Sequence, residues 1–182
     1  MKKSARAAED FKGKIMQKDN IILVGLPGAG KSTVGVLLAK FVGKGFLDTD
    51  LLLQCASGIR LPQIIEREGA SGFLSYENRI LAGLSVENTV IATGGSAVYG
   101  EDAMKHLASL GKVVYLKISY ETLCLRVGDL ALRGVVGEHA DTLEGIYRER
   151  IPLYEKYADV IVSAEYANPA DAARAVAEAL EK

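Results

Sequence analysis

The sequence predicts an α/β fold in which a parallel sheet of about five strands lies between two layers of helices. The first observation is that short apolar runs alternate with amphipathic segments along the 182 residues, as in folds built from βαβ units. The second is that the runs 21–24, 90–93 and 113–118 are almost continuously apolar, which is typical of parallel strands buried on both faces. The third is a glycine-rich loop between the first run and the first helical segment. A chain of this length suits a single three-layer α/β/α domain.

The glycine-rich loop, Gly25 to Ser32, matches the pattern G-x-x-x-x-G-K-[ST] of a phosphate-binding P-loop, the Walker A motif. It opens into 32–41, whose apolar residues recur at helical spacing. Its glycines allow backbone N–H groups to converge on phosphates, Lys31 adds a positive charge that reaches the β- and γ-phosphates, and Ser32 can give its hydroxyl to Mg²⁺. The expected nucleotide-binding residues of this loop are Gly25, Gly28, Ala29, Gly30, Lys31, Ser32 and Thr33.

Composition argues against nucleic acid and membrane partners. The chain carries 22 Lys and Arg against 23 Asp and Glu, a formal net charge of −1, which offers no attraction to a polyanion. No apolar run approaches the roughly 20 residues that span a bilayer. We therefore expect a cytoplasmic monomer whose partners are small molecules. Cys55 and Cys124 form no C-x-x-C pattern, so we expect two reduced, buried thiols.

The remaining segments continue the alternation of strands and helices. Residues 1–18 carry mixed charge and little periodicity, which predicts a poorly ordered extension before a folded domain over 19–182. The stretch of about 49–86 reads as helices only and predicts a helical insertion, whereas weak periodicity over about 128–141 predicts a mobile lid. The expected strands lie at 46–48, 90–93, 113–118 and 160–162, and the expected helices at 51–56, from 61, and at 73–84, 101–110, 120–127, 142–157 and 169–180.

Polar side chains and bare backbone follow two of the predicted strands. Asp48-Thr49-Asp50 ends the strand at 46–48, and Gly94-Gly95 follows the strand at 90–93. Open parallel sheets bind ligands at this edge. The chain has neither the N-K-x-D motif with which GTPases recognise guanine nor the strand ending in Asp-Glu of motor ATPases, so the pattern favours a small-molecule kinase. A solvated turn at the aspartates and an ordinary strand-end turn at the glycines are the plainer alternatives.

From about Asp19 to Pro169 the chain resembles the shikimate kinases of the nucleoside-monophosphate-kinase-like group. Each shared motif is weak alone, but the order and spacing of all of them are specific to this family. The resemblance implies a P-loop fold with a helical substrate-binding insertion and a lid. The matching segments are Gly25 to Thr33, Asp48-Thr49-Asp50, Gly58-Ile59, Ile64-Ile65, Phe73 with Glu77, Ala92-Thr93-Gly94-Gly95, Val113 to Leu116, Arg150 to Tyr154 and Ala158-Asp159.

The resemblance also implies roles on the nucleotide side of the site. Lys31 and Arg133 act on the transferring phosphoryl group, Arg126 lies against the adenine of ATP, and Asp48 holds Mg²⁺ together with Ser32. Hard oxygen ligands suit Mg²⁺, and phosphoryl transfer depends on positioning and charge neutralisation. A plain helix-surface arginine at 126 and a solvated loop charge at 133 remain as alternatives.

On the substrate side, the resemblance implies that Asp50 binds the hydroxyls and helps to deprotonate the attacking one. Gly94 and Gly95 would offer their backbone, and Arg150 would pair with the substrate carboxylate, although a charge at a helix end is an alternative for this arginine. The implied activity is ATP-dependent phosphorylation of a hydroxyl on a small metabolite. Shikimate, converted to shikimate 3-phosphate in aromatic amino acid biosynthesis, is the first expectation.

The chain departs from the family pattern where that carboxylate would bind. Leu74 follows Phe73 where the family places an arginine, although Glu77, the usual partner of that arginine, is retained, and Ser96 replaces a third glycine. Two alternatives therefore stay open, namely a kinase for a different hydroxylated compound and a nucleotide-binding regulatory protein without turnover. The candidates to replace the missing charge are Arg60, Arg67 and Arg79.

Overall fold

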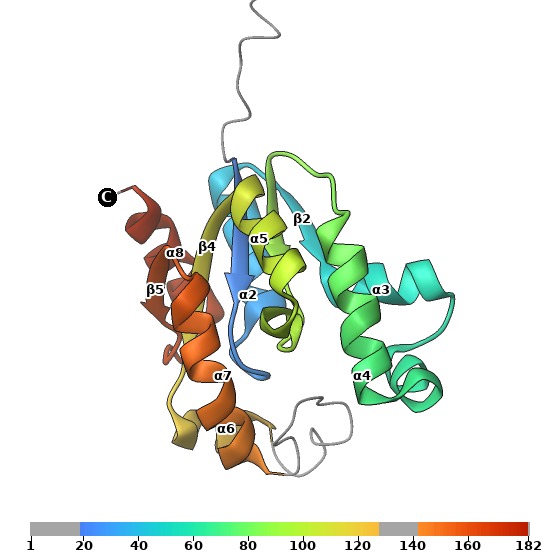
Figure 1. The fold of residues 1–182 in the computed structure, drawn as a ribbon. Helices are drawn as coiled ribbons and strands as arrows, with labels where there is room; N and C mark the ends of the chain where they lie inside the picture. Colours follow the sequence, from blue (N-terminus) through green and yellow to red (C-terminus); the bar gives the residue numbers. More distant parts are fainter. Residues whose placement is uncertain (1–18, 128–141, 182) are drawn as a thin grey trace, which may run out of the picture.

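The structure, a computed structural model, describes residues 19–127 and 142–181 (Figure 1). The expected extension 1–18 and the expected lid at 128–141, with Arg133, lie outside the described residues. Among the helices that are described, none is long and apolar enough to cross a membrane.

The centre of the fold is a five-stranded sheet with the strand order β2-β3-β1-β4-β5. All neighbouring strands are parallel, and Leu23 of β1 stands in register between Ala92 of β3 and Val114 of β4. The predicted parallel sheet of about five strands is confirmed. The strands are β1 (Asn20–Val24), β2 (Gly45–Asp48), β3 (Thr89–Ala92), β4 (Gly111–Lys117) and β5 (Val160–Ser163).

Helices cover both faces of the sheet, which gives the predicted three layers (Figure 1). On one face α2 and α8 pack against each other, and α5 and α7 lie on the other face against β4. The helices are α2 (Lys31–Val42), α3 (Thr49–Ser57), α4 (Leu61–Ala82), the short 3₁₀ helix η1 (Ala97–Tyr99), α5 (Glu101–Leu110), α6 (Tyr120–Val127), α7 (Leu143–Tyr157) and α8 (Pro169–Leu180).

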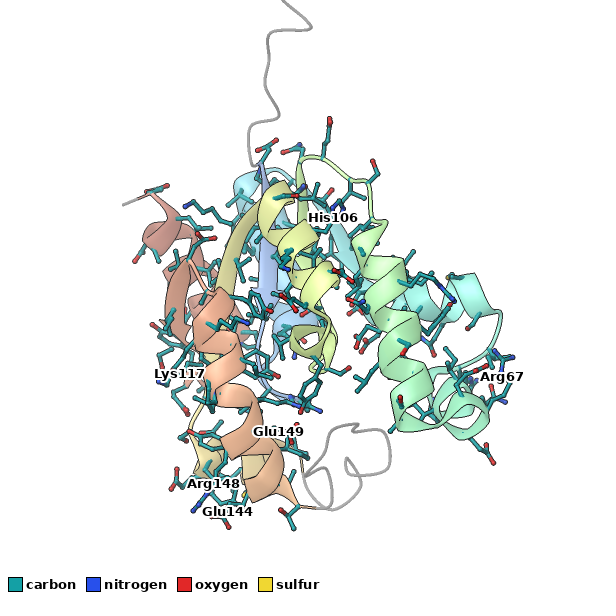
Figure 2. All side chains as sticks on the ribbon, in the orientation of Figure 1. Arg67, His106, Lys117, Glu144, Arg148 and Glu149 are labelled. Carbon is teal, nitrogen blue, oxygen red and sulfur yellow. The ribbon has the colours of Figure 1, made fainter. Side chains whose placement is uncertain are left out.

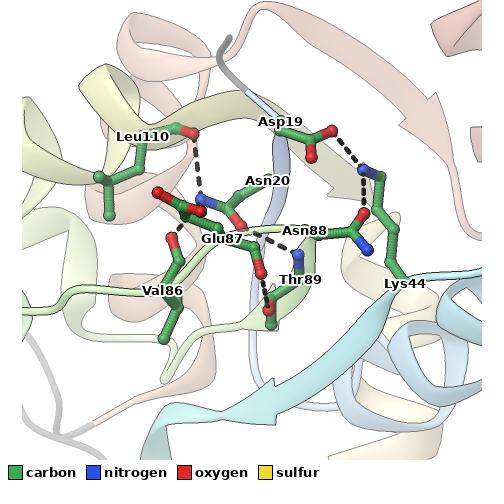
Figure 3. Close-up of polar contacts among 8 residues, drawn as sticks. All are labelled: Asp19, Asn20, Lys44, Val86, Glu87, Asn88, Thr89 and Leu110. Carbon is green, nitrogen blue, oxygen red and sulfur yellow. Dashed lines mark hydrogen bonds and ion pairs between the residues drawn. The ribbon is translucent and has the colours of Figure 1, made fainter. Parts of the chain in front are cut away.

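The side chain of Asn20 ties together the amino ends of the central strands. Its Nδ2 donates to the carbonyl oxygens of Val86 and Leu110 at 2.8 and 3.1 Å, and its Oδ1 accepts from the N–H of Thr89 at 2.9 Å (Figure 3). These bonds satisfy a buried amide and close the amino-terminal edge of the sheet. The opposite edge, at the carboxyl ends of the strands, is left for ligands.

The helices between β2 and β3 build a small core of their own. Leu53, Ile64 and Phe73 are buried together there, and Leu74 is among the partly buried side chains packed against them. The two helices expected from 61 and over 73–84 join in α4, with a non-helical residue at Gly69, where φ is 70° and ψ is 175°. This left-handed backbone suits glycine and marks the break that sequence pattern placed between two helices.

The expectation of buried cysteines is wrong, because both Cys55 and Cys124 are exposed. In α3 the buried positions are Thr49 and Leu53, and in α6 the buried position is Leu123. A helix turns about 100° per residue, so positions one or two places after a buried residue face away from the core. The thiols therefore lie on the outer faces of their helices.

Candidate active site

A cavity of about 430 Å³ opens at the carboxyl edge of the sheet. Four separate parts of the chain meet there, namely the loop after β1, the segments that follow β2 and β3, one side of α4, and the inward face of α7. Its lining residues are Pro27, Gly28, Gly30, Lys31, Ser32, Thr33, Asp50, Leu61, Phe73, Thr93, Gly94, Gly95, Ser96 and Arg150.

The P-loop between β1 and α2 has the backbone that phosphate binding requires. Gly25, Gly28 and Gly30 have φ angles of 151°, 74° and 87°, in the region that favours glycine. At Gly25 a Cβ would stand 2.7 Å from the carbonyl oxygen of Leu116, so no other residue fits beside β4. Ala29 is buried and its N–H donates to the carbonyl of Leu26 at 3.1 Å, which closes the turn.

Lys31 is held on the loop itself. It is only 8% exposed, and its Nζ donates to the carbonyl oxygens of Gly25 and Leu26 at 2.7 and 2.9 Å. Burial lowers the pKa of this ammonium to about 8, against the opposing effect of the nearby Asp50 carboxylate. A phosphate is a stronger, charged acceptor than these carbonyls, so the lysine is poised to move its bonds onto a nucleotide.

Ser32 and Asp48 present two oxygen atoms beside the P-loop. The hydroxyl of Ser32 donates to Oδ2 of Asp48 at 2.6 Å. The other oxygen, Oδ1, accepts from the N–H of Asp50 at 2.9 Å and so caps α3, which fixes the carboxylate in place. No group of three or more His, Cys, Asp or Glu that could hold a metal exists in 19–127 and 142–181. One hydroxyl and one carboxylate fit Mg²⁺, which binds to few protein ligands and keeps several waters.

Asp50 faces the bare backbone of Gly94. A Cβ at Gly94 would stand 2.7 Å from both Oδ1 of Asp50 and Oε1 of Glu77, so only glycine fits between the two carboxyl groups. Burial raises the pKa of Asp50, and the neighbouring Asp48 adds to this effect. The N–H of Gly94 is engaged by the hydroxyl of Thr49 at 3.0 Å, which leaves Gly95 as the residue of the pair that can offer an N–H.

Arg150 reaches the cavity from the middle of α7 rather than from a helix end. It is 1% exposed, its Nε donates to the hydroxyl of Tyr99 at 3.2 Å, and its guanidinium lies over the Tyr99 ring, 5.3 Å from the centroid. A Cβ at Gly95 would stand 2.9 Å from Nη1 of this arginine. The interior position removes the alternative of a solvated helix-end charge, because this cation is buried at the ligand site.

Arg126 lies at the mouth of the P-loop, at the end of α6. Its guanidinium donates to the carbonyl oxygens of Gly28, Ala164 and Tyr166 at 3.3, 3.0 and 3.4 Å. These bonds tie the P-loop to α6 and to the segment after β5. The side chain is exposed yet fixed in direction, so it presents a flat cation next to the phosphate site.

Glu77 and Ser96 form a pair that sequence reasoning missed. Glu77 is 2% exposed, and its Oε2 accepts from the hydroxyl of Ser96 at 2.6 Å. Its Oε1 has no hydrogen-bond partner among the residues that the structure describes. Burial raises the pKa of this carboxyl to about 7, although the Ser96 hydroxyl favours the ionised form. Ser96, which replaces the third glycine of the family pattern, thus gives the Glu77 carboxylate a hydrogen-bond partner, whereas Leu74 cannot.

The arginines proposed to replace the missing charge do not line the cavity. Arg67 pairs with Glu68 at 2.8 Å, and Figure 2 shows it on the outer edge of the α3–α4 insertion. Arg79 lies over the ring of Tyr76, 5.6 Å from its centroid, and Arg60 is exposed before α4. Arg150 is therefore the one arginine of the described residues that lines the cavity.

The chain has the features of a small-molecule kinase of the P-loop class. Its P-loop enters a helix, β1 lies between β3 and β4 in a parallel sheet, and acidic and basic groups surround one cavity. The family model for shikimate kinase matches residues 27–181, so the chain belongs to the shikimate kinase family. Both the predicted family and the predicted class, an ATP-using phosphotransferase that acts on a hydroxyl, are confirmed.

Relatives and solved structures agree with this assignment. The chain is 41% identical over 149 residues to a shikimate kinase of Thiobacillus denitrificans, covering 80% of this chain and 81% of the relative. It is 36% identical over 166 residues to one of Methylococcus capsulatus, covering 90% and 93%. The structure resembles shikimate kinase from Acinetobacter baumannii in complex with shikimate, with a TM-score of 0.82 and 33% identity over 90% of this chain and 93% of that one.

Proposed function

We propose that this chain transfers the γ-phosphoryl group of ATP to a hydroxyl of shikimate and releases shikimate 3-phosphate and ADP. Family membership supports the reaction class. The observation that carries the proposal is that one cavity joins the P-loop to a partly buried carboxylate, Asp50, and a buried guanidinium, Arg150. A compound with a carboxylate and hydroxyls meets both a cation and a hydrogen-bond acceptor in such a cavity.

On the nucleotide side, the loop N–H groups and Lys31 bind the β- and γ-phosphates and neutralise charge as the phosphoryl group moves. The adenine is assigned to Arg126, and the bonds that hold this guanidinium to the P-loop and to the segment after β5 support the assignment. Arg133, which is outside the described residues, is proposed from sequence alone to reach the transferring group.

Ser32 and Asp48 are the residues that would hold Mg²⁺, and their hydroxyl and carboxylate oxygens suit this hard cation. When bound, the ion supplies positive charge to the phosphates during transfer. The carboxylate is fixed in advance by its cap on α3, so binding costs little reorganisation.

On the substrate side, Asp50 accepts the hydrogen of the attacking hydroxyl, and its raised pKa brings it closer to the range of a general base. Arg150 binds the carboxylate through charged hydrogen bonds, and Gly95 offers its N–H nearby. Because Gly94 has no side chain, the space between the carboxyl groups of Asp50 and Glu77 stays open.

The test is ADP release coupled to a spectroscopic readout, with ATP, Mg²⁺ and shikimate. The wild-type chain should release ADP only when shikimate is present, and Lys31→Ala should abolish this turnover. Lys40→Ala, on an exposed position of the same helix α2, is the matched control and should behave as the wild type. Full activity of Lys31→Ala would refute the phosphate-loop mechanism.

A second candidate is a kinase for a different hydroxylated compound, and Leu74 favours it. One arginine lines the cavity among the described residues, and losing a charged hydrogen bond to a carboxylate costs about 1.5–3 kcal/mol, or about ten- to a hundredfold in affinity. A screen of hydroxylated acids in the same assay decides between the two, because the true substrate gives the highest kcat/KM.

A further inference from the structure

Ser96 lines the cavity, and its hydroxyl does not make the helix-capping bond that is usual at its position. It is the residue before η1, where a serine side chain commonly accepts a bond from the helix backbone. Here the side chain makes no such bond, and the turn is closed by the Ser96 carbonyl, which accepts from the N–H of Tyr99 at 3.0 Å. The hydroxyl instead donates to Oε2 of Glu77 at 2.6 Å.

Glu77 fixes the polarity of that hydroxyl. An ionised carboxylate only accepts hydrogen bonds, so the single proton of the Ser96 hydroxyl is committed to it. Glu77 is 2% exposed and Ser96 is 7% exposed, so a further partner for Ser96 has to come from the cavity that it lines. Ser96 lines the cavity, and its hydroxyl oxygen keeps lone pairs but has no proton left to donate.

The groups around Ser96 include both a hydrogen-bond donor and further acceptors. Beside Gly95 lies a donor, since Nη1 of Arg150 stands 2.9 Å from where a Cβ would be. Beside Gly94 lie acceptors, the carboxyl oxygens of Asp50 and Glu77. The cavity thus has a donor beside Gly95 and acceptors beside Gly94, and Ser96 adds an acceptor next to Gly95 in the chain.

We propose that Ser96, fixed by Glu77, is a specificity-determining residue that accepts a hydrogen bond from a substrate hydroxyl other than the one that is phosphorylated. This inference rests on the proposed function and names a further contact of the same site. A hydroxyl or another donor satisfies Ser96. An ether, a ketone or a carboxylate at the same point would place lone pair against lone pair, so the site selects for a polyhydroxylated acid over one with fewer hydroxyls.

The test combines a protein change with a substrate change. Wild type and Ser96→Ala are assayed at pH 8, where Glu77 with a pKa of about 7 is ionised, on shikimate and on two analogues that lack its C4 or its C5 hydroxyl. On one of the analogues the wild type should lose about tenfold in kcat/KM. Ser96→Ala should lose about tenfold on shikimate but nothing further on that analogue, because the two changes remove the same bond.

Ser75→Ala on α4, an exposed serine whose hydroxyl donates to the carbonyl of Ser71, is the control and should match the wild type on all three compounds. Glu77→Gln should lower the preference for shikimate over the sensitive analogue. An amide can donate as well as accept, so it no longer forces the Ser96 hydroxyl to donate its proton to the side chain at position 77. Melting temperatures of each variant show which of them are folded.

The inference fails if Ser96→Ala keeps wild-type kcat/KM on shikimate, or if it loses the same factor on shikimate and on both analogues, which is the signature of a structural role. It fails in its second part if Glu77→Gln keeps the full preference. Absence of any shikimate turnover by the wild type would instead refute the proposed function, and this inference with it.

Discussion

Replacing Glu77 by glutamine should change how the stability of the protein depends on pH. Glu77 is buried, and its pKa is raised from 4.5 to about 7 mainly by that burial, with a smaller contribution from Asp50. Between about pH 4.5 and pH 7 the native state keeps a proton that the unfolded chain has released. The free energy of unfolding therefore falls as pH rises through this window.

The size of the effect follows from the shift. The raised pKa corresponds to about 3 kcal/mol of native-state stability that is present below about pH 4.5 and lost by about pH 7. Glutamine keeps the volume of the side chain and cannot ionise, so Glu77→Gln should lack this loss. The free energy of unfolding of the variant minus that of the wild type should therefore be about 3 kcal/mol larger at pH 8 than at pH 4.5. For a domain of this size, that change corresponds to about 6–12 °C in Tm.

The assay is urea unfolding of both proteins at several pH values from 4.5 to 8. The comparison is between two chains that differ at one residue, so other titrating groups, including Asp50 with its raised pKa, largely cancel. Glu66→Gln, an exposed position on the same helix, should leave the pH dependence of the wild type unchanged. Parallel stability curves for wild type and Glu77→Gln would refute the account of a buried, ionisable Glu77.

Three further predictions concern the substrate site. Arg150→Met, which keeps the length of the side chain, should raise KM for shikimate about ten- to a hundredfold with little change in KM for ATP, and an equal rise in both would contradict the assigned role. Leu74→Arg should add a second carboxylate contact and a partner for Glu77, lowering KM for shikimate about tenfold in steady-state assays; an unchanged KM in a folded variant would show that α4 cannot deliver the charge. Gly94→Ala should lower kcat/KM for shikimate at least about tenfold, because its Cβ would stand 2.7 Å from carboxyl oxygens of Asp50 and Glu77, and wild-type kinetics would mean that both carboxyl groups move aside freely.

The sheet and the P-loop were predictable because their signals are local. The continuous apolar runs that become β1, β3 and β4 are buried on both faces, and such runs leave few alternatives to parallel strands. The loop from Gly25 to Ser32 carries its pattern within a few residues of the chain. The break in α4 was also expected, because the pattern predicted separate helices from 61 and over 73–84, but it did not single out Gly69 as the position of the break.

The pairing of Glu77 with Ser96 could not be predicted in this way. The two residues lie 19 positions apart on different elements, and each has a plain local interpretation as a helix carboxylate or a residue of a strand-end turn. Only the packing of α4 against η1 brings them together. Cys55 and Cys124 were mispredicted for a related reason. Residue type predicts only that cysteines tend to be buried, whereas the position of each residue around its helix decides whether it is exposed.

Phosphorylation of shikimate by this chain is tested most directly by identifying the product of the wild-type enzyme. ATP, Mg²⁺ and shikimate are incubated with the full chain, ADP is quantified, and ³¹P NMR identifies the phosphorylated compound and the position of the new ester. The expected result is ADP and shikimate 3-phosphate in equal amounts. ADP release without any phosphorylated shikimate, or efficient phosphorylation of a different hydroxylated acid with shikimate left untouched, would contradict it.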